Sequence, residues 1–172
     1  MIEDKQPAVR ALPLRPAGSQ GQQHFEKHCT ACQLCVSACP NQVLRPASDL
    51  PHLMQPEMSY EKGYCRPECN ACSQVCPSDA IRPIEAGQKL NMSIGKASVN
   101  LALCLSATGE ASCGNCARHC PVGAILMVTG EGGRKIPTLV ENECTGCGAC
   151  EFLCPTRPIS AITVNGCSVH YE

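Results

Sequence analysis

Short apolar segments alternate with polar ones along this chain, and none of the apolar runs is long. The longest are residues 124–128 and 99–105, and Asn100 interrupts the second. A membrane-spanning helix needs about 20 consecutive apolar residues, so the sequence predicts no transmembrane segment. The other apolar segments are short enough to be strands, and we expect them at residues 42–44, 53–60, 79–81, 90–94, 123–128, 136–140 and 160–164.

Two further segments complete the expected organisation. Residues 94–104, IGKASVNLALC, are the longest candidate helix. Residues 1–23 are rich in Pro, Gln and Ala and show no periodicity, so they are expected to form an extended N-terminal arm or linker. Residues 24–172 then form the body of the protein.

The cysteines change this picture, because they form a repeat. Seventeen of the 172 residues are Cys, while there is no Trp and there are only two Phe and three Tyr. Such a chain has few large side chains to bury, so its fold is expected to depend on metal or covalent cross-links. Four groups, spanning residues 29–39, 65–76, 104–120 and 144–154, each end in C-x2-C-x3-C-P. Their cysteines are Cys29, Cys32, Cys35 and Cys39; Cys65, Cys69, Cys72 and Cys76; Cys104, Cys113, Cys116 and Cys120; and Cys144, Cys147, Cys150 and Cys154.

Groups one and four, CTACQLCVSACP and CTGCGACEFLCP, match the bacterial ferredoxin run C-x2-C-x2-C-x3-C-P. Three thiolates in a tight loop can bind three irons of one cubane, while the fourth begins a short helix and binds the neighbouring cluster. Disulfides and zinc are the alternatives. Repeated C-x2-C spacings are awkward for linking distant segments by disulfides, and zinc sites use two separated cysteine pairs. The sequence therefore favours four [4Fe-4S] clusters, with all sixteen grouped cysteines as iron ligands.

Two groups make one two-cluster unit, so four groups imply an α+β fold of two modules like bacterial dicluster ferredoxins. Each module has small antiparallel strand pairs and short helices around its clusters. Group three has an eight-residue insert, LSATGEAS, which is expected to form a loop outside the cluster cage. Cys104 before this insert is expected to be a ligand, the alternative being a buried thiol with a different ligand or a three-iron cluster in its place. Cys167 lies outside every group and is expected not to be a ligand.

The formal charge of −1 gives no basic excess, so binding to nucleic acid has no electrostatic support. Each oxidised cluster with its four thiolates adds about −2, which makes the holoprotein distinctly acidic. The basic residues beside the groups either offset this charge or are surface cations; they are Lys27, Arg66, Arg118 and Arg157. The sequence has no nucleotide-binding glycine motif and no catalytic triad. It therefore favours an electron carrier without substrate chemistry of its own.

The stretch RPAGSQGQQHFEKHCTACQLCVSACPNQVL, the groups that follow it and the closing CTGCGACEFLCPTRPISAI resemble the ferredoxin-type NapF and NapG/MauM family over roughly residues 15–166. The resemblance implies transfer of single electrons between a membrane-bound or quinol-linked donor and a partner oxidoreductase. The alternatives are an accessory or maturation protein of a molybdenum-dependent reductase, and a soluble domain of a larger membrane redox protein. The N-terminus lacks an apolar signal core and a twin-arginine pair, so the chain as written is expected in the cytoplasm; the periplasmic face of the membrane is the alternative for a processed chain.

The pairing of the groups is implied by resemblance, and the sequence agrees with it in that the regular groups are the outer ones and the irregular groups the inner ones. Similarity to electron-transfer subunits of molybdenum oxidoreductases implies nesting, in which group one shares two clusters with group four, and group two with group three. The nested ligand sets are Cys29, Cys32, Cys35 and Cys154; Cys144, Cys147, Cys150 and Cys39; Cys65, Cys69, Cys72 and Cys120; and Cys104, Cys113, Cys116 and Cys76. The alternative is sequential pairing, one with two and three with four.

Overall fold

A computed structural model of the chain describes residues 4–171. The α-helices in this part are all short: α1 Gln22–His28, α2 Leu34–Ala38, α3 Ala71–Gln74, α4 Leu105–Thr108, α5 Asn115–Arg118 and α6 Ala149–Phe152. The strands are β1 Leu44–Pro46, β2 Pro56–Met58, β3 Ser93–Val99, β4 Ile125–Thr129, β5 Lys135–Leu139 and β6 Ile162–Tyr171. Single turns of 3-10 helix lie at η1 Leu50–His52, η2 Gln88–Asn91, η3 Glu131–Gly133 and η4 Glu141–Glu143. None of the helices described is long and apolar enough to cross a membrane.

The strands pair two by two, and every pair is antiparallel. β1 pairs with β2, β4 with β5, and β3 with β6. The first two pairs join neighbours in the sequence, whereas the third joins the strand before group three to the strand after group four. The expected α+β fold of short helices and small antiparallel strand pairs is therefore confirmed.

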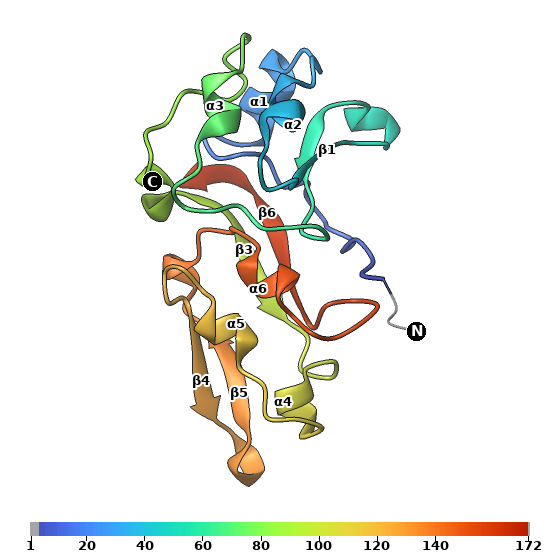
Figure 1. Cartoon of the computed structure of the whole chain (residues 1–172), viewed down its shortest axis with the longest axis vertical. Helices are drawn as coiled ribbons and strands as arrows, with labels where there is room; N and C mark the ends of the chain where they lie inside the picture. The colour runs from blue at the N-terminus through green and yellow to red at the C-terminus, as the bar shows by residue number, and fades with distance from the viewer. Residues whose placement is uncertain (1–3, 172) are drawn as a thin grey trace.

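The molecule has two halves that follow one another along its longest axis (Figure 1). Helices α1, α2 and α3 and the β1–β2 pair lie at one end, while α4, α5 and the β4–β5 pair lie at the other. The β3–β6 pair runs between them. Within the halves, α2 contacts α3 and α5 contacts α6. Each half thus brings together two helices that lie within consecutive cysteine groups.

The N-terminal segment and the last strand both connect the halves. Residues 14–19 are buried, and the amide of Met58 donates to the carbonyl of Leu14 at 2.9 Å. Further back, the amide of Gln6 donates to the carbonyl of Pro158 in the other half at 2.9 Å. At the opposite end of the chain, Val169 of β6 forms a bridge with Gly21, just before α1. Both ends of the chain therefore cross from one half to the other.

The candidate helix over residues 94–104 is wrong. The structure has strand β3 at Ser93–Val99, followed by a turn. Ile94 and Ala97 are buried, and the backbone from Gly95 onward is paired with β6. The tertiary pairing decides the conformation, because a segment this short has little helical preference of its own.

The expected strand over residues 79–81 is also wrong, although its apolar residues are buried as expected. Ala80 and Ile81 are each 1% exposed, but they lie in a turn. The next amide, of Arg82, donates to the carbonyl of Gly18 at 2.9 Å. This single hydrogen bond between the two segments is not followed by others, so no pair of strands forms. The other apolar segments overlap the observed strands.

Candidate iron–sulfur cluster sites

Each cysteine group is built around one of the short helices. The third cysteine of a group lies within the helix, and the fourth lies just beyond the last helical residue. The expectation that the fourth cysteine begins a helix is therefore wrong. These pairs are Cys35 and Cys39 at α2, Cys72 and Cys76 at α3, Cys116 and Cys120 at α5, and Cys150 and Cys154 at α6. Each of these helices is four or five residues long, about one turn, so its two cysteines can face different cavities.

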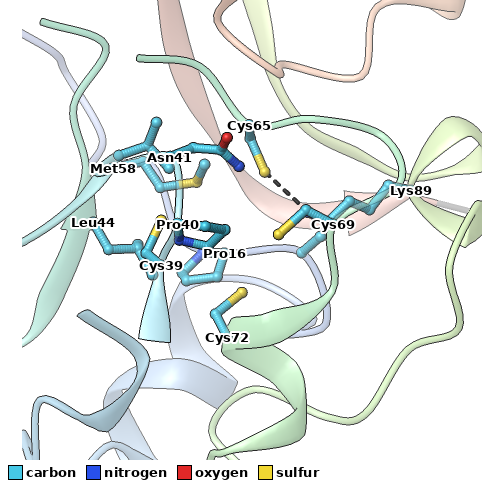
Figure 2. Close-up of a pocket in the computed structure, with 12 residues that line it drawn as sticks. Pro16, Cys39, Pro40, Asn41, Leu44, Met58, Cys65, Cys69, Cys72 and Lys89 are labelled. Carbon is cyan, nitrogen blue, oxygen red and sulfur yellow. Dashed lines mark hydrogen bonds between the residues drawn. The ribbon is translucent and has the colours of Figure 1, made fainter. Parts of the chain in front are cut away.

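One cavity in the N-terminal half is lined by Cys65, Cys69 and Cys72 of group two together with Cys39 of group one. We call these four cysteines set B. Figure 2 shows their side chains gathered around one space, with Pro16, Pro40, Leu44 and Met58 forming part of its wall. These apolar groups exclude water from the sulfur atoms. The fourth cysteine of group one thus lies with group two.

The first three cysteines of group one lie with the fourth cysteine of group two. Burial raises the pKa of Cys35 to about 11, and the neighbouring thiolates of Cys29, Cys32 and Cys76 add to this shift. We call these four cysteines set A. Cys32 is exposed, so set A reaches the protein surface.

The C-terminal half repeats this exchange. One cavity is lined by Cys144, Cys147 and Cys150 of group four with Cys120 of group three, which form set C. Another is lined by Cys104, Cys113 and Cys116 of group three with Cys154 of group four, which form set D. Pro121 lines the cavity of set C and Pro155 that of set D. The proline after a fourth cysteine therefore becomes part of the wall beside the set that this cysteine joins.

The nested pairing of the groups is wrong. Under nesting Cys39 would join group four, but it lines the cavity of Cys65, Cys69 and Cys72. Likewise Cys154 joins group three rather than group one. The physical reason is that α2 packs on α3 and α5 on α6. Each fourth cysteine therefore reaches the group on the adjacent helix, and the pairing is sequential.

The chemistry of these sites suits a group that neutralises thiolates. Burial raises the pKa of Cys72 to about 12 and those of Cys116 and Cys147 to about 11. Buried sulfur atoms in such places need bound cations to become thiolates. Backbone amides also point at sulfur: Ala124 donates to Cys120 at 3.2 Å, and Ile81 donates to Cys76 at 3.4 Å. Amide hydrogen bonds of this kind stabilise cluster-bound sulfur, so the residues present fit iron–sulfur clusters.

Cys104, which precedes the insert of group three, and Cys167, which lies outside every group, have different surroundings. Cys104 lines the cavity of set D with Cys113 and Cys116, in spite of the insert that separates them in the sequence. The insert is not a simple loop, because its first half forms α4, which contacts β5. Cys167 lies on β6 and does not line the cavities of sets B, C and D. Within residues 4–171, no three His, Cys, Asp or Glu side chains converge on a position for a single metal ion.

Sequence reasoning missed Lys89, which contacts a cysteine sulfur directly. Its Nζ lies 3.0 Å from Sγ of Cys65, and only 8% of the residue is exposed (Figure 2). Burial alone lowers the pKa of Lys89, but the thiolates of set B raise it more, so the net shift is upward. Lys89 lies between groups two and three. The only feature of the sequence that could have pointed to it is a single cation near the apolar residues Leu90 and Met92.

The basic residues beside the groups make other contacts. Arg157 donates to the carbonyl of Cys154 at 2.5 Å, and Arg118 donates to the side chain of Asn115. The guanidinium of Arg66 lies over the ring of Tyr64. In the part of the chain described, no side chain of Lys27, Arg66, Arg118 or Arg157 donates to a cysteine sulfur. Proximity in sequence was therefore a poor guide to which cation meets a cluster site.

The two halves meet where set B adjoins set C. The amide of Cys65 donates to the carbonyl of Cys147 at 2.9 Å. The buried Tyr60 donates its hydroxyl to the carbonyl of Gly146 at 2.6 Å, also across the boundary. Cys65, Cys147 and Lys89 line one small cavity between the halves. The four sets therefore form a row in the order A, B, C, D.

Comparison with known proteins agrees with this arrangement. The family described as "4Fe-4S dicluster domain" matches residues 28–80 and 111–157. Each match contains cysteines of two consecutive groups, as the sequential pairing requires. The chain belongs to the 4Fe-4S dicluster ferredoxin family. Its ferredoxin modules follow one another in the sequence, as the two halves do in space.

Individual relatives place the chain more closely within the ferredoxin-type proteins. It is 32% identical to ferredoxin-type protein NapF of Escherichia coli K12, over 86% of this chain and 84% of NapF. It is 33% identical to methylamine utilization ferredoxin-type protein MauM of Methylobacillus flagellatus, over 86% of this chain and 66% of that protein. Ferredoxin-type protein NapG of Escherichia coli K12 is 32% identical, over 89% and 71%. The expected resemblance to the NapF and NapG/MauM family is thus confirmed, and the chain is a ferredoxin-type 4Fe-4S electron-transfer protein.

Proposed function

We propose that this ferredoxin-type protein carries four [4Fe-4S] clusters, one on each of sets A to D, and relays single electrons along that row. All sixteen grouped cysteines, including Cys104, then serve as ligands. When bound, such clusters accept and release one electron at a time. The chain supplies the thiolates, the apolar walls that exclude water and the amides that donate to sulfur. It performs no substrate chemistry of its own.

The continuity of the row carries this proposal. Sets A and B are connected by α2 and α3, because each of these helices carries a cysteine for one set and ends beside a cysteine for the other. Helices α5 and α6 connect sets C and D in the same way. The hydrogen bond from Cys65 to Cys147 connects sets B and C. A continuous path of covalent bonds within the helices and one hydrogen bond between the halves therefore leads from set A to set D.

The ends of the row are the expected places of exchange with partners. Cys32 of set A is exposed, and Cys104 and Cys113 of set D are partly exposed. We propose that one end receives electrons from a membrane-bound or quinol-linked donor and that the other passes them to a partner oxidoreductase. The name of the relative MauM, methylamine utilization ferredoxin-type protein, supports a role within such a redox system.

Anaerobic purification with iron and sulfide counting tests the cofactor content. We expect about 16 iron and about 16 sulfide per chain. In the Cys39→Ser variant, the EPR signal of one cluster changes while those of the others stay as in wild type. Cys167→Ser is the matched control and leaves every signal unchanged. A content of about half these values, or an altered spectrum in Cys167→Ser, contradicts the assignment of four clusters to these sets.

Reconstitution with a donor and a terminal oxidoreductase tests the relay. We expect electron flow to depend on the holoprotein and to stop when its clusters are removed. The accessory alternative makes a different prediction, in which electrons pass equally well without the protein but the terminal enzyme stays inactive until this chain has acted on it. That result would overturn the relay while leaving the cluster assignment intact.

A further inference from the structure

The four sets differ in the groups that contact their sulfur atoms. In set A, Cys76 accepts from the amide of Ile81 and lies 3.7 Å from the hydroxyl of Ser78. In set C, Cys120 accepts from the amide of Ala124. In set D, Cys154 lies 3.6 Å from the hydroxyl of Thr156. These contacting groups are all neutral.

Set B is different, because a buried cation contacts its sulfur. Nζ of Lys89 is 3.0 Å from Sγ of Cys65 and 3.4 Å from the carbonyl oxygen of Arg66 (Figure 2). No acidic side chain forms an ion pair with Lys89 in the part of the chain described. The cation is therefore directed at the sulfur and is not neutralised by a carboxylate.

We infer that Lys89 gives the cluster of set B the highest reduction potential of the four, so that the first electron taken up by the protein resides there. This inference deepens the proposed relay and rests on it for the presence of a cluster. Reduction adds one electron and makes the cluster more negative by one charge. A fixed positive charge close to a ligand sulfur stabilises the reduced form more than the oxidised form, and burial strengthens this interaction.

The position of Lys89 gives this effect a place in the relay. The side chain lines both the cavity of set B and the small cavity between the halves, where Cys65 meets Cys147. Electrons that enter from set A therefore reach the site of highest potential just before they cross to set C. The step between the two halves then becomes uphill in energy. Lys89 would not itself bind the cluster; it would act on it through its positive charge next to the Cys65 sulfur.

Redox titration followed by EPR tests the inference. The signal of set B is first identified as the one altered by Cys39→Ser. In the wild-type protein we expect this signal to appear before the others as the potential is lowered. In Lys89→Met its midpoint falls and it no longer appears first, whereas Lys89→Arg, which keeps the charge, restores the wild-type order. Lys62→Met is the control, because Lys62 is exposed and its removal changes the total charge equally.

Two results would overturn the inference. One is a set B signal that appears first in Lys89→Met as well as in the wild type. The other is an equal shift in Lys62→Met, which would assign the effect to total charge. Either outcome is independent of the relay, because the titration uses a chemical reductant and no partner. Failure of electron transfer to the oxidoreductase with unchanged titrations would instead overturn the proposed function alone.

A measurement on the wild-type protein covers the case in which the Met variant does not assemble its cluster. The protein is produced with 15N-labelled lysine and reduced until only the first signal is present. Pulsed EPR is then expected to detect coupling between this signal and one lysine nitrogen. The coupling disappears in Lys89→Arg, which has no lysine at this position. Absence of coupling in the wild-type protein contradicts the contact on which the inference depends.

Discussion

Two glycines in the fourth cysteine group show how tightly the cluster loops pack. Gly146 and Gly148 both have positive φ, at 79° and 81°. A Cβ on Gly148 would lie 2.3 Å from the ring of Tyr60, and a Cβ on Gly146 would lie 2.6 Å from the backbone of Gly95. The loop therefore needs glycine for its backbone conformation and also for the close approach of Tyr60 and of strand β3.

The Gly148→Ala variant is expected to lose stability through both effects. The left-handed conformation costs about 1 kcal/mol for alanine, and the collision with the buried Tyr60 adds a larger penalty because the ring cannot move aside. Gly132→Ala is the matched control, since Gly132 has a φ of 68° and nothing within 4 Å of an added Cβ. Thermal unfolding of the holoprotein should occur at a clearly lower temperature in Gly148→Ala than in Gly132→Ala. Equal unfolding temperatures would show that the contact with Tyr60 is unimportant.

His170 on β6 is expected to make stability depend on pH. Burial lowers the pKa of His170 from 6.5 to about 4, and neither ring nitrogen has a hydrogen-bond partner. The unfolded chain therefore binds a proton that the folded chain rejects, so stability is full above pH 6.5 and falls as the pH drops toward 4. The loss is on the order of 2 kcal/mol. In His170→Phe, unfolding temperatures measured between pH 7 and 5 should fall less than in wild type; parallel curves would contradict this.

At the scale of elements, a buried ion pair fastens the N-terminal segment to the C-terminal half. Arg10 donates to both carboxylate oxygens of Glu151 on α6, at 2.8 and 3.1 Å, and to the carbonyl of Val164 at 2.6 Å. The side chains are only 9% and 4% exposed. Glu151 also accepts from the amide of Val164 at 2.7 Å. The pair therefore joins the arm, a helix of the cluster loop and the longest strand.

Removing Arg10 should destabilise the protein strongly. In Arg10→Met the carboxylate of Glu151 remains buried without its partner, which costs about 3–5 kcal/mol. Arg45→Met is the control: Arg45 pairs with Glu57 and Glu61, but its side chain is 42% exposed, so its loss costs about 1 kcal/mol or less. Chemical unfolding of both holoproteins under anaerobic conditions measures the difference. If the two variants unfold alike, the arm does not depend on this pair.

The strands that sequence predicted correctly are those in which apolar residues follow a Cys-Pro or precede a cysteine group. β3 was predicted as a helix because its small and charged residues, such as Gly95 and Lys96, hide the alternation. Its conformation is fixed by β6, which lies far away in the sequence. The turn at Ala80 and Ile81 has a strand-like sequence but lacks a partner strand. The errors therefore lie where long-range pairing, and not local pattern, decides the structure.

For the candidate sites too, features set by local sequence could be predicted, and features set by long-range packing could not. The grouping of the cysteines can be recognised from their spacing, because the spacing matches what a cluster would require, and the structure brings the first three members of groups two, three and four together as expected. Pairing depends on which helices pack together, and the sequence does not contain that information in any local pattern. Lys89 could not be found either, since it contacts Cys65 only after the segment between groups two and three has folded back.

For the whole molecule, we expect folding to depend on iron. Nearly half of the buried hydrophobic residues are Ala or Cys, and these cysteines include Cys35, Cys144, Cys150 and Cys154. Without metal these thiols contribute little burial energy, and metal binding energy becomes folding energy. The iron-free protein should therefore show weak circular dichroism and no cooperative thermal transition. A sharp transition in the iron-free chain, close to that of the holoprotein, would contradict this expectation.

The sequential exchange of cysteines also has a consequence for biosynthesis. All eight thiols of the N-terminal half are present once the ribosome has passed residue 76, so this half can receive its metal while the remainder is still being translated. The bridge between Gly21 and Val169, in contrast, forms only when the last residues have emerged. The sequential arrangement thus allows the first two centres to mature before the molecule closes, an order that a nested arrangement would not permit.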